Sequence, residues 1–297
     1  MKKNRPNKAF SLIEISIVIL IVGILISGVS LGVDLYQDFR LASARSLTQN
    51  SRVGRINDLV LWLEASQKSS FEPDNIANGT AITKWKNIAP NLLANDRARF
   101  DAVKASSAVS GPIYRENVIN SLAGLEFVNS ENRCMQVASG FDGNGKDTTV
   151  FLVIKTAENW SSAADYRLLS RWPDGNGTSN LAWYEIRGNN SVFSNANNSY
   201  SWINYSVNSS KLTLFNLIMN RSSNIRFYLN RKISGTVVNT WTGSHSNTLL
   251  FIGCKGGWTT LSPNANFLEI IVYDRVLSDN ERIAIEDYLS KKWGNFN

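Results

Sequence analysis

The feature that most constrains this chain is a run from Ile15 to Val33 that carries no charged side chain and follows a single acid, Glu14. At 1.5 Å per residue, a helix of this length spans about 29 Å, close to the hydrocarbon thickness of a bilayer. A carboxylate at the edge of such a span is costly, so an ionisable residue there is expected to have a function. The run predicts a membrane-inserted helix in which Glu14 has a specific role.

The residues before the run read Lys8-Ala9-Phe10-Ser11-Leu12-Ile13-Glu14. This arrangement resembles the processing site of type IV prepilins and pseudopilins, where a dedicated peptidase cuts before a Phe and methylates the new amine. The resemblance implies a leader of residues 1–9, cleavage between Ala9 and Phe10, methylation of Phe10 and retention of Glu14. The chain departs from the family at Ala9, where the family usually has Gly, although Ala is also small.

Two other interpretations compete for the same segment. An ordinary secretory signal would be cleaved after a small residue such as Ser30, but its apolar region is normally about 7–15 residues long and rarely carries an acid. A plain signal anchor explains the length of the run and leaves Glu14 without a role. We therefore favour pilin-type processing.

The resemblance also implies a role for Glu14. Once the leader is removed, Phe10 carries a positive amine in a medium of low dielectric, which needs an opposite charge nearby. In the pilin family this acid is thought to pair with the amine of an adjacent subunit. We therefore expect Glu14 to serve assembly with other pilin or pseudopilin subunits.

The charge distribution sets the orientation and excludes one class of partner. The leader has four basic side chains and no acid, so it should stay in the cytoplasm while the bulk of the chain crosses the membrane. The whole chain has 31 basic and 24 acidic side chains, and removal of the leader leaves 27 against 24, a net charge of +3. Such a small charge gives no reason to expect a nucleic-acid partner.

After the span, residues 34–55 lack proline and mix charged with apolar side chains, which predicts that the helix continues as a stem to about Gly54. We assign residues 10–57 to a transmembrane and stem helix. The remaining residues, 58–297, are enough for one large domain with a substantial core.

This last part of the chain predicts a mainly β fold, because short apolar or alternating runs are separated by Asn, Ser and Gly. Many short strands with regular turns are typical of a β-sandwich or jelly roll. The expected strands are Leu59–Leu63, Leu122–Val128, Thr148–Lys155, Arg167–Arg171, Leu181–Arg187, Lys211–Asn220, Ile225–Asn230, Thr248–Gly253 and Phe267–Tyr273.

The chain closes with one clear helix. Ser278 and Glu281 form a capping box, and Ile285, Leu289 and Trp293 follow at helical spacing on one face. The segment from Phe267 through this helix resembles the end of bacterial laminin-G-like domains, which have a concanavalin A-like sandwich. The segments 59–65, 82–87 and 225–230 are also similar to that family. The resemblance covers residues 58–294 and implies a laminin-G-like head.

No residue pattern predicts an active site, so we expect no enzymatic activity. Glycosidases of concanavalin A-like fold need paired carboxylates, whereas Glu185 and Glu269 each stand alone on an expected strand. We interpret Glu269 as a structural residue, because the fold alone does not license activity. The single histidine, His245, lies in a polar loop without a catalytic or metal-binding motif around it.

Two kinds of ligand remain open for the head. Asp142, Asn144 and Asp147 supply oxygen ligands at spacings that loosely resemble half of a calcium loop, but Asp-Gly and Asn-Gly are also ordinary turns, which we favour. The head therefore requires no cofactor, with calcium as the alternative. Sugar binding by an exposed aromatic side chain is also open, with five candidates near loops: Trp160, Trp172, Trp202, Trp241 and Trp258.

Cys134 and Cys254 are the only two cysteines. Outside the cytoplasm they can form a structural disulfide, and two buried thiols are the equal alternative.

Together these features predict a minor or tip type IV pilin-like subunit whose head binds a glycan or protein ligand. The expected partners are the prepilin peptidase, other pilin subunits and the membrane. The expected location is the bacterial inner membrane, with the head outside the cytoplasm, and then a pilus or pseudopilus. The alternatives are a secretion-system pseudopilin whose head only contacts assembly proteins, and a membrane-tethered carbohydrate-active enzyme.

Overall fold

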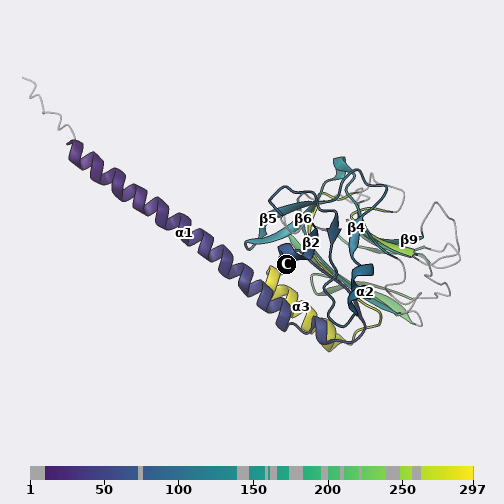
Figure 1. Cartoon of the computed structure of the whole chain (residues 1–297). Helices are drawn as coiled ribbons and strands as arrows, with labels where there is room; N and C mark the ends of the chain where they lie inside the picture. The colour runs from purple at the N-terminus through teal and green to yellow at the C-terminus, as the bar shows by residue number, and fades with distance from the viewer. Residues whose placement is uncertain are drawn as a thin grey trace, which may run out of the picture.

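The computed structural model describes residues 11–72, 76–138, 147–157, 160, 166–173, 183–194, 200–207, 211–220, 223–238, 248–255 and 262–296. A long N-terminal helix projects from one side of a β-sandwich, and a C-terminal helix lies against the end of the long helix that meets the sandwich (Figure 1). The prediction of a mainly β protein with a long N-terminal helix and a short C-terminal helix is confirmed.

Helix α1 (Leu12–Asn50) is continuous over 39 residues. It begins at Ser11, whose side chain forms a capping box with Glu14, and it contains no proline. The helix ends at Ser51, which adopts an extended conformation and donates its hydroxyl hydrogen to the carbonyl oxygen of Thr48 at 2.9 Å. The α-helix is thus slightly shorter than predicted, and a single 3-10 turn (Val53–Arg55) covers the rest of the expected stem.

The described strands form two antiparallel sheets. The eight-stranded sheet runs in the order β15-β14-β13-β8-β17-β6-β5, and β1 also pairs with β17. Its strands are β1 (Leu59–Glu64), β5 (Ile113–Ile119), β6 (Leu122–Phe127), β8 (Thr148–Thr156), β13 (Leu212–Met219), β14 (Asn224–Leu229), β15 (Lys232–Val238) and β17 (Ala265–Tyr273).

The nine-stranded sheet runs in the order β12-β11-β10-β9-β16-β7-β4-β3-β2. Its strands are β2 (Phe71–Glu72), β3 (Lys84–Trp85), β4 (Ala102–Lys104), β7 (Met135–Val137), β9 (Arg167–Pro173), β10 (Trp183–Arg187), β11 (Asn190–Ser194), β12 (Tyr200–Asn204) and β16 (Thr248–Ile252). The other described helices are α2 (Ala94–Arg99), α3 (Asp279–Trp293) and two 3-10 turns at Lys68–Ser70 and Asn129–Glu131.

Two cores lie on opposite faces of the eight-stranded sheet. Val150, Leu152 and Ile154 of β8 face the core between the sheets. Phe151 and Val153, the alternate residues, face a second core that includes side chains of α3 and the end of α1. Because helices cover the outer face of this sheet, its central strands are apolar on both faces, which explains their unbroken apolar runs.

All nine expected strands are present in the described residues, with small differences at their ends. Residues 181–182 of the expected strand Leu181–Arg187 lie outside the described part of the chain. The sequence missed β5, β11, β12, β15 and the four short strands β2, β3, β4 and β7. In β15 most side chains are exposed, and Gly235 interrupts the apolar pattern.

Candidate functional site: the apolar helix and its junction with the sandwich

The first part of α1 is apolar and entirely exposed. Every described side chain from Ser11 to Val33 is exposed, and the helix is long and apolar enough to cross a membrane. An exposed apolar surface of this extent is not stable in water, so lipid or other apolar helices must cover it.

Glu14 has a defined position at the start of this surface. Its Oε2 atom accepts a hydrogen bond from the backbone N–H of Ser11 at 2.8 Å. The carboxylate therefore lies at the positive end of the helix dipole, next to the point where a chain beginning at Phe10 would carry its amine. Ala9 and Phe10 themselves lie outside the described residues. This capping role was not predicted, although Ser11 and Glu14 have the spacing of a capping box.

The end of α1 is packed into the sandwich. Ala44 and Thr48 are buried, and the Nε atom of Arg40 donates a hydrogen bond to the carbonyl oxygen of Asn120 at 3.4 Å. Helix α3 packs against this part of α1 (Figure 1). The junction of α1, α3 and the eight-stranded sheet is therefore part of the folded core.

A buried polar network lies inside this junction. We call it the junction cluster and define it as Thr48, Glu64, Glu269, Tyr288 and Lys292, which come from α1, β1, β17 and α3. The Lys292 ammonium lies 2.7 Å from Glu64 Oε1 and 3.1 Å from Glu269 Oε2, and it donates to Thr48 Oγ1 at 2.9 Å. All five side chains are nearly or fully buried.

Glu269 is the most heavily hydrogen-bonded member of the cluster. It accepts hydrogen bonds from Tyr288 at 2.8 Å and from the indole N–H groups of Trp62 and Trp293, each at 2.7 Å, in addition to its ion pair with Lys292. Burial raises the pKa of the Tyr288 phenol well above its usual value, so the phenol stays protonated as a donor. Because both oxygens of the Glu269 carboxylate already have hydrogen-bond or ion-pair partners, Glu269 has a structural role.

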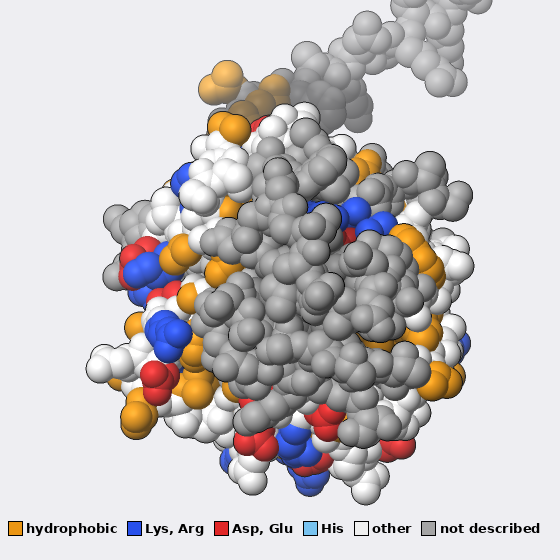
Figure 2. All heavy atoms as spheres, turned by 90° about the vertical axis from the view of Figure 1, so that its right-hand side faces the viewer, with side chains coloured by type: hydrophobic (Ala, Val, Ile, Leu, Met, Phe, Trp, Pro, Cys, Tyr) orange, Lys and Arg blue, Asp and Glu red, His pale blue; other side chains and the backbone are white. Residues whose placement is uncertain are grey.

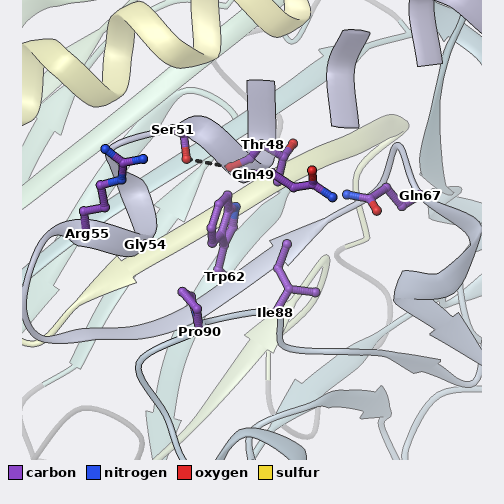
Figure 3. A pocket seen from close by; sticks show the side chains of 9 residues that line it. All are labelled: Thr48, Gln49, Ser51, Gly54, Arg55, Trp62, Gln67, Ile88 and Pro90. Atoms are coloured by element: carbon purple, nitrogen blue, oxygen red, sulfur yellow. Dashed lines mark hydrogen bonds between the residues drawn. The ribbon is translucent and has the colours of Figure 1, made fainter. Parts of the chain in front are cut away.

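A cavity of about 400 Å³ lies beside the cluster. Trp62 occupies its centre, Gln49 and Gln67 point toward one another at one end, and Arg55 lies at the other (Figure 3). The complete lining is Thr48, Gln49, Ser51, Gly54, Arg55, Trp62, Gln67, Ile88 and Pro90. No carboxylate is among these described lining residues, so the cavity does not offer the acid pair that glycoside hydrolysis requires.

The second isolated acid, Glu185 on β10, is also held by cations. Glu185 Oε2 lies 2.8 Å from Arg167 Nε and 2.6 Å from Arg187 Nη2, and Lys255 lies 3.4 Å from Oε1. Burial lowers the pKa of the Lys255 ammonium, and the negative charge of Glu185 partly offsets this effect. Glu185 is fully buried within the nine-stranded sheet and stands in an ion-pair network.

The two cysteines are brought together. Cys134, just before β7, and Cys254, just after β16, form a disulfide with a Cα–Cα distance of 5.5 Å. β7 and β16 are paired neighbours in the nine-stranded sheet, which places the two residues side by side.

The residues of the alternative calcium site, which we interpreted as a turn, and the candidate sugar-binding tryptophans lie only partly within the described residues. Asp142, Asn144, His245, Trp241 and Trp258 lie outside the described residues, and Asp147 is described just before β8. Among the described residues, no group of three or more His, Cys, Asp or Glu side chains could hold a metal ion.

Of the remaining predicted tryptophans, Trp160 is buried and Trp202 is 48% exposed. Trp172 lies in β9, where only its backbone is described. On the face of the head that is turned away from α1, described basic, acidic and hydrophobic side chains are interspersed around the margin (Figure 2).

Comparison with known proteins identifies the N-terminal segment. The family model described as the prokaryotic N-terminal methylation motif matches residues 4–30. The predicted resemblance to the N terminus of type IV prepilins is therefore confirmed. No curated protein matches the chain.

Comparison with solved structures identifies the fold of the head. The binding domain of Paraclostridial Mosquitocidal Protein 1 matches with a TM-score of 0.55 and 12% identity, over 80% of this chain and 55% of that one. The binding domain of botulinum neurotoxin serotype D matches with a TM-score of 0.53 and 12% identity, over 80% of this chain and 52% of that one. This chain thus spans about half the length of the structures it matches, and the likeness shows a shared β-sandwich fold.

Proposed function

We propose that this protein is a minor or tip subunit of a type IV pilin-like assembly, built in through α1 and presenting its head for adhesion or recognition. The observation that carries the proposal is the methylation motif at residues 4–30, which overlaps the exposed apolar part of α1. Glu14 at the start of that helix supports assembly, because its carboxylate lies where it can pair with the amine of a neighbouring subunit.

In this proposal the prepilin peptidase cuts between Ala9 and Phe10 and methylates Phe10. Before assembly the subunit is anchored in the bacterial inner membrane with its head outside the cytoplasm, and it is then incorporated into a pilus or pseudopilus. The head is about 240 residues long and would crowd a helical array if every subunit carried it, which favours a minor or tip position.

We further propose that the head binds a glycan or protein ligand and is not an enzyme. The ion pairs and hydrogen bonds of Glu185 and Glu269 support this, because neither acid is available for catalysis. The matched structures are toxin binding domains, and one of them is described as a ligand binding domain in complex with N-acetylneuraminic acid (TM-score 0.51, 12% identity, 82% of this chain and 56% of that one). Their description as binding domains also favours a binding role here.

Two measurements on the native host test the assembly proposal. Mass spectrometry of the mature protein is expected to find a methylated Phe10 at the N terminus, whereas a chain beginning near Leu31 would indicate an ordinary secretory signal. The variant Glu14→Gln keeps a side chain that can cap the helix but removes the charge. It should lower incorporation into the filament about a hundredfold or more, since loss of a buried charge partner costs about 3–5 kcal/mol.

The matched control is Asp38→Asn, an exposed acid on the same helix beyond the apolar segment. This variant should assemble normally. Normal assembly of Glu14→Gln would contradict the role proposed for the carboxylate. Co-purification with pseudopilins, together with no ligand binding by the head, would favour the secretion-system alternative.

A further inference from the structure

We propose that the edge of the nine-stranded sheet formed by β11 and β12 binds a neutral saccharide, with Trp202 as an aromatic platform and Asn190 and Asn204 as polar contacts. The inference rests on the proposed recognition role of the head and assigns it a site and a ligand class. Strands β9, β10, β11 and β12 are consecutive neighbours in this sheet, and β9 lies on the side of the head away from α1 (Figure 1).

Trp202 is exposed in a way that its described counterparts are not. It is 48% exposed, whereas Trp62, Trp85, Trp160 and Trp293 are at most 5% exposed. A large apolar ring left in water at a fixed position is a feature of binding surfaces, where it combines contact area with few rotatable bonds.

The ring of Trp202 is held in place from one side. The guanidinium of Arg187 lies 5.1 Å from the centre of the ring, which is the geometry of a cation–π contact. Arg187 is in turn fixed by its ion pair with the buried Glu185 at 2.6 Å. The platform is therefore preorganised, which lowers the entropy lost when a ligand stacks on it.

Polar side chains lie next to the platform on the same face of the sheet. Asn204 is two residues beyond Trp202 on β12, so both side chains point to one face, about 7 Å apart along the strand. Asn190 of β11 is directly opposite Asn204 in the pairing register. The distance of about 7 Å between Trp202 and Asn204 along the strand is comparable with the length of one sugar unit.

A cavity of about 340 Å³ opens at these asparagines. It is lined by Trp160, Asn189, Asn190, Asn204, Tyr205 and Ser206. Its volume lies at the small end of the range of about 300–1,000 Å³ found for ligand pockets.

The hydrogen-bonding state of the lining favours a hydroxyl-rich ligand. The Tyr205 hydroxyl contacts the carbonyl oxygens of Arg187 and Asn190 at 2.5 and 2.8 Å, which fixes the β10–β11 turn. The side-chain oxygen of Asn190 and the indole N–H of Trp160 are buried and have no hydrogen-bond partner among the described residues. Sugar hydroxyls both donate and accept, so they suit a pocket that offers unused acceptors and donors together.

The charge of the site selects a neutral ligand. All six lining residues are uncharged, and the adjacent Arg167 and Arg187 both form ion pairs with Glu185. An acidic sugar or a phosphate would meet no cation among the described lining residues, whereas a neutral sugar would lose no ion pair on binding.

The test measures binding of neutral hexasaccharides to the full chain in detergent micelles, with maltohexaose, cellohexaose and chitohexaose as probes. Titration calorimetry gives the affinity, and quenching of tryptophan fluorescence reports stacking. At least one probe should bind, and Trp202→Ala should weaken that binding about tenfold or more. Asn204→Ala should weaken it several-fold. The control is Ile233→Ala, an exposed apolar residue on β15 of the other sheet, which should bind like the unmodified protein.

Three outcomes would overturn the proposal. They are binding of no probe, equal affinity in Trp202→Ala, and binding of polygalacturonate in place of the neutral sugars. The assembly proposal can fail without this one. A protein that is not methylated but still binds a hexasaccharide through Trp202 would contradict the assembly proposal and support the saccharide site. Conversely, a methylated and assembled protein that binds no probe would refute this inference alone.

Discussion

At the scale of single residues, Lys292 is the side chain on which α1, β1, β17 and α3 converge. It neutralises part of the charge of two buried carboxylates, Glu64 and Glu269, and it donates to Thr48 of the stem. Buried charges are tolerated only when they are paired and hydrogen-bonded, so removal of this amine leaves two acids in an apolar surrounding.

Replacement of Lys292 by Met is therefore expected to lower the free energy of unfolding by about 3–5 kcal/mol. Chemical denaturation of the full chain in detergent measures this loss, and limited proteolysis should show faster cleavage between α1 and the sandwich. Lys291→Met is the matched control, because Lys291 is exposed on the same helix and should change stability little. Equal unfolding midpoints for both variants would contradict the role assigned to the junction cluster.

Glu14 and Glu269 differ in how far the sequence alone explains their contacts. The capping partner of Glu14 is three residues away, so the local spacing contains the signal for this contact, although we predicted only the role of Glu14 in assembly. The structural role expected for Glu269 agrees with its hydrogen bonds, but its partners Trp62 and Lys292 are distant in the sequence. These three residues meet because β1 pairs with β17 and α3 packs on the same sheet. No local sequence pattern specifies this topology.

At the scale of elements, α3 and the central strands followed from sequence because their patterns are strong. Ser278 caps α3 as expected, β8 contains the unbroken apolar run from Val150 to Ile154, and β13 is mainly apolar and buried on both faces. β15 was missed because its side chains are mainly exposed, and β5 was missed because Arg115, Glu116 and Asn117 interrupt its apolar residues. Pairing with a neighbour defines both strands more than an apolar pattern does. Strand β12 was also not predicted, because polar residues lie among its apolar ones. Trp202 on this strand was nevertheless a candidate for sugar binding.

The start of α3 gives a prediction about pH. Arg275 donates hydrogen bonds to Glu281 at 3.1 and 2.5 Å and lowers the pKa of its carboxyl to about 2. Because the folded pKa lies below the unfolded one, the stabilisation is present at neutral pH and is lost as the pH falls from about 4.5 to about 2.

Glu281→Gln should keep the capping hydrogen bond to Ser278 and lose the charge. We expect this variant to be less stable than the unmodified protein at pH 7 and equally stable near pH 2, as measured by thermal unfolding across this range. Asp96→Asn, an exposed acid on α2, should show no such pH-dependent difference. A constant difference from pH 7 to pH 2 would mean that the ion pair with Arg275 does not stabilise the helix start.

At the scale of the whole molecule, the disulfide joins two residues that are 120 positions apart. Cys134 precedes β7 and Cys254 follows β16, so the disulfide closes a loop that contains β7 to β16, with strands of both sheets. A crosslink across a long loop restricts the unfolded chain, and its removal typically costs about 2–5 kcal/mol.

The double variant Cys134→Ala, Cys254→Ala is therefore expected to unfold at a lower denaturant concentration than the unmodified protein. Addition of a reductant should shift the unmodified protein toward the variant and leave the variant unchanged. If reductant has no effect on the unmodified protein, the two sulfur atoms are not bonded.

The connection between the stem and the sandwich has a mechanical consequence. The chain passes from the end of α1 through one 3-10 turn directly into β1, and β1 pairs with β17 in the interior of its sheet. Tension applied along α1 is therefore transmitted to β1. To detach, β1 would have to shear past the long, buried strand β17, and the hydrogen bonds between the two strands would resist together. A ligand that pulls on β12, at the edge of the nine-stranded sheet, would be linked to α1 through the buried core between the two sheets.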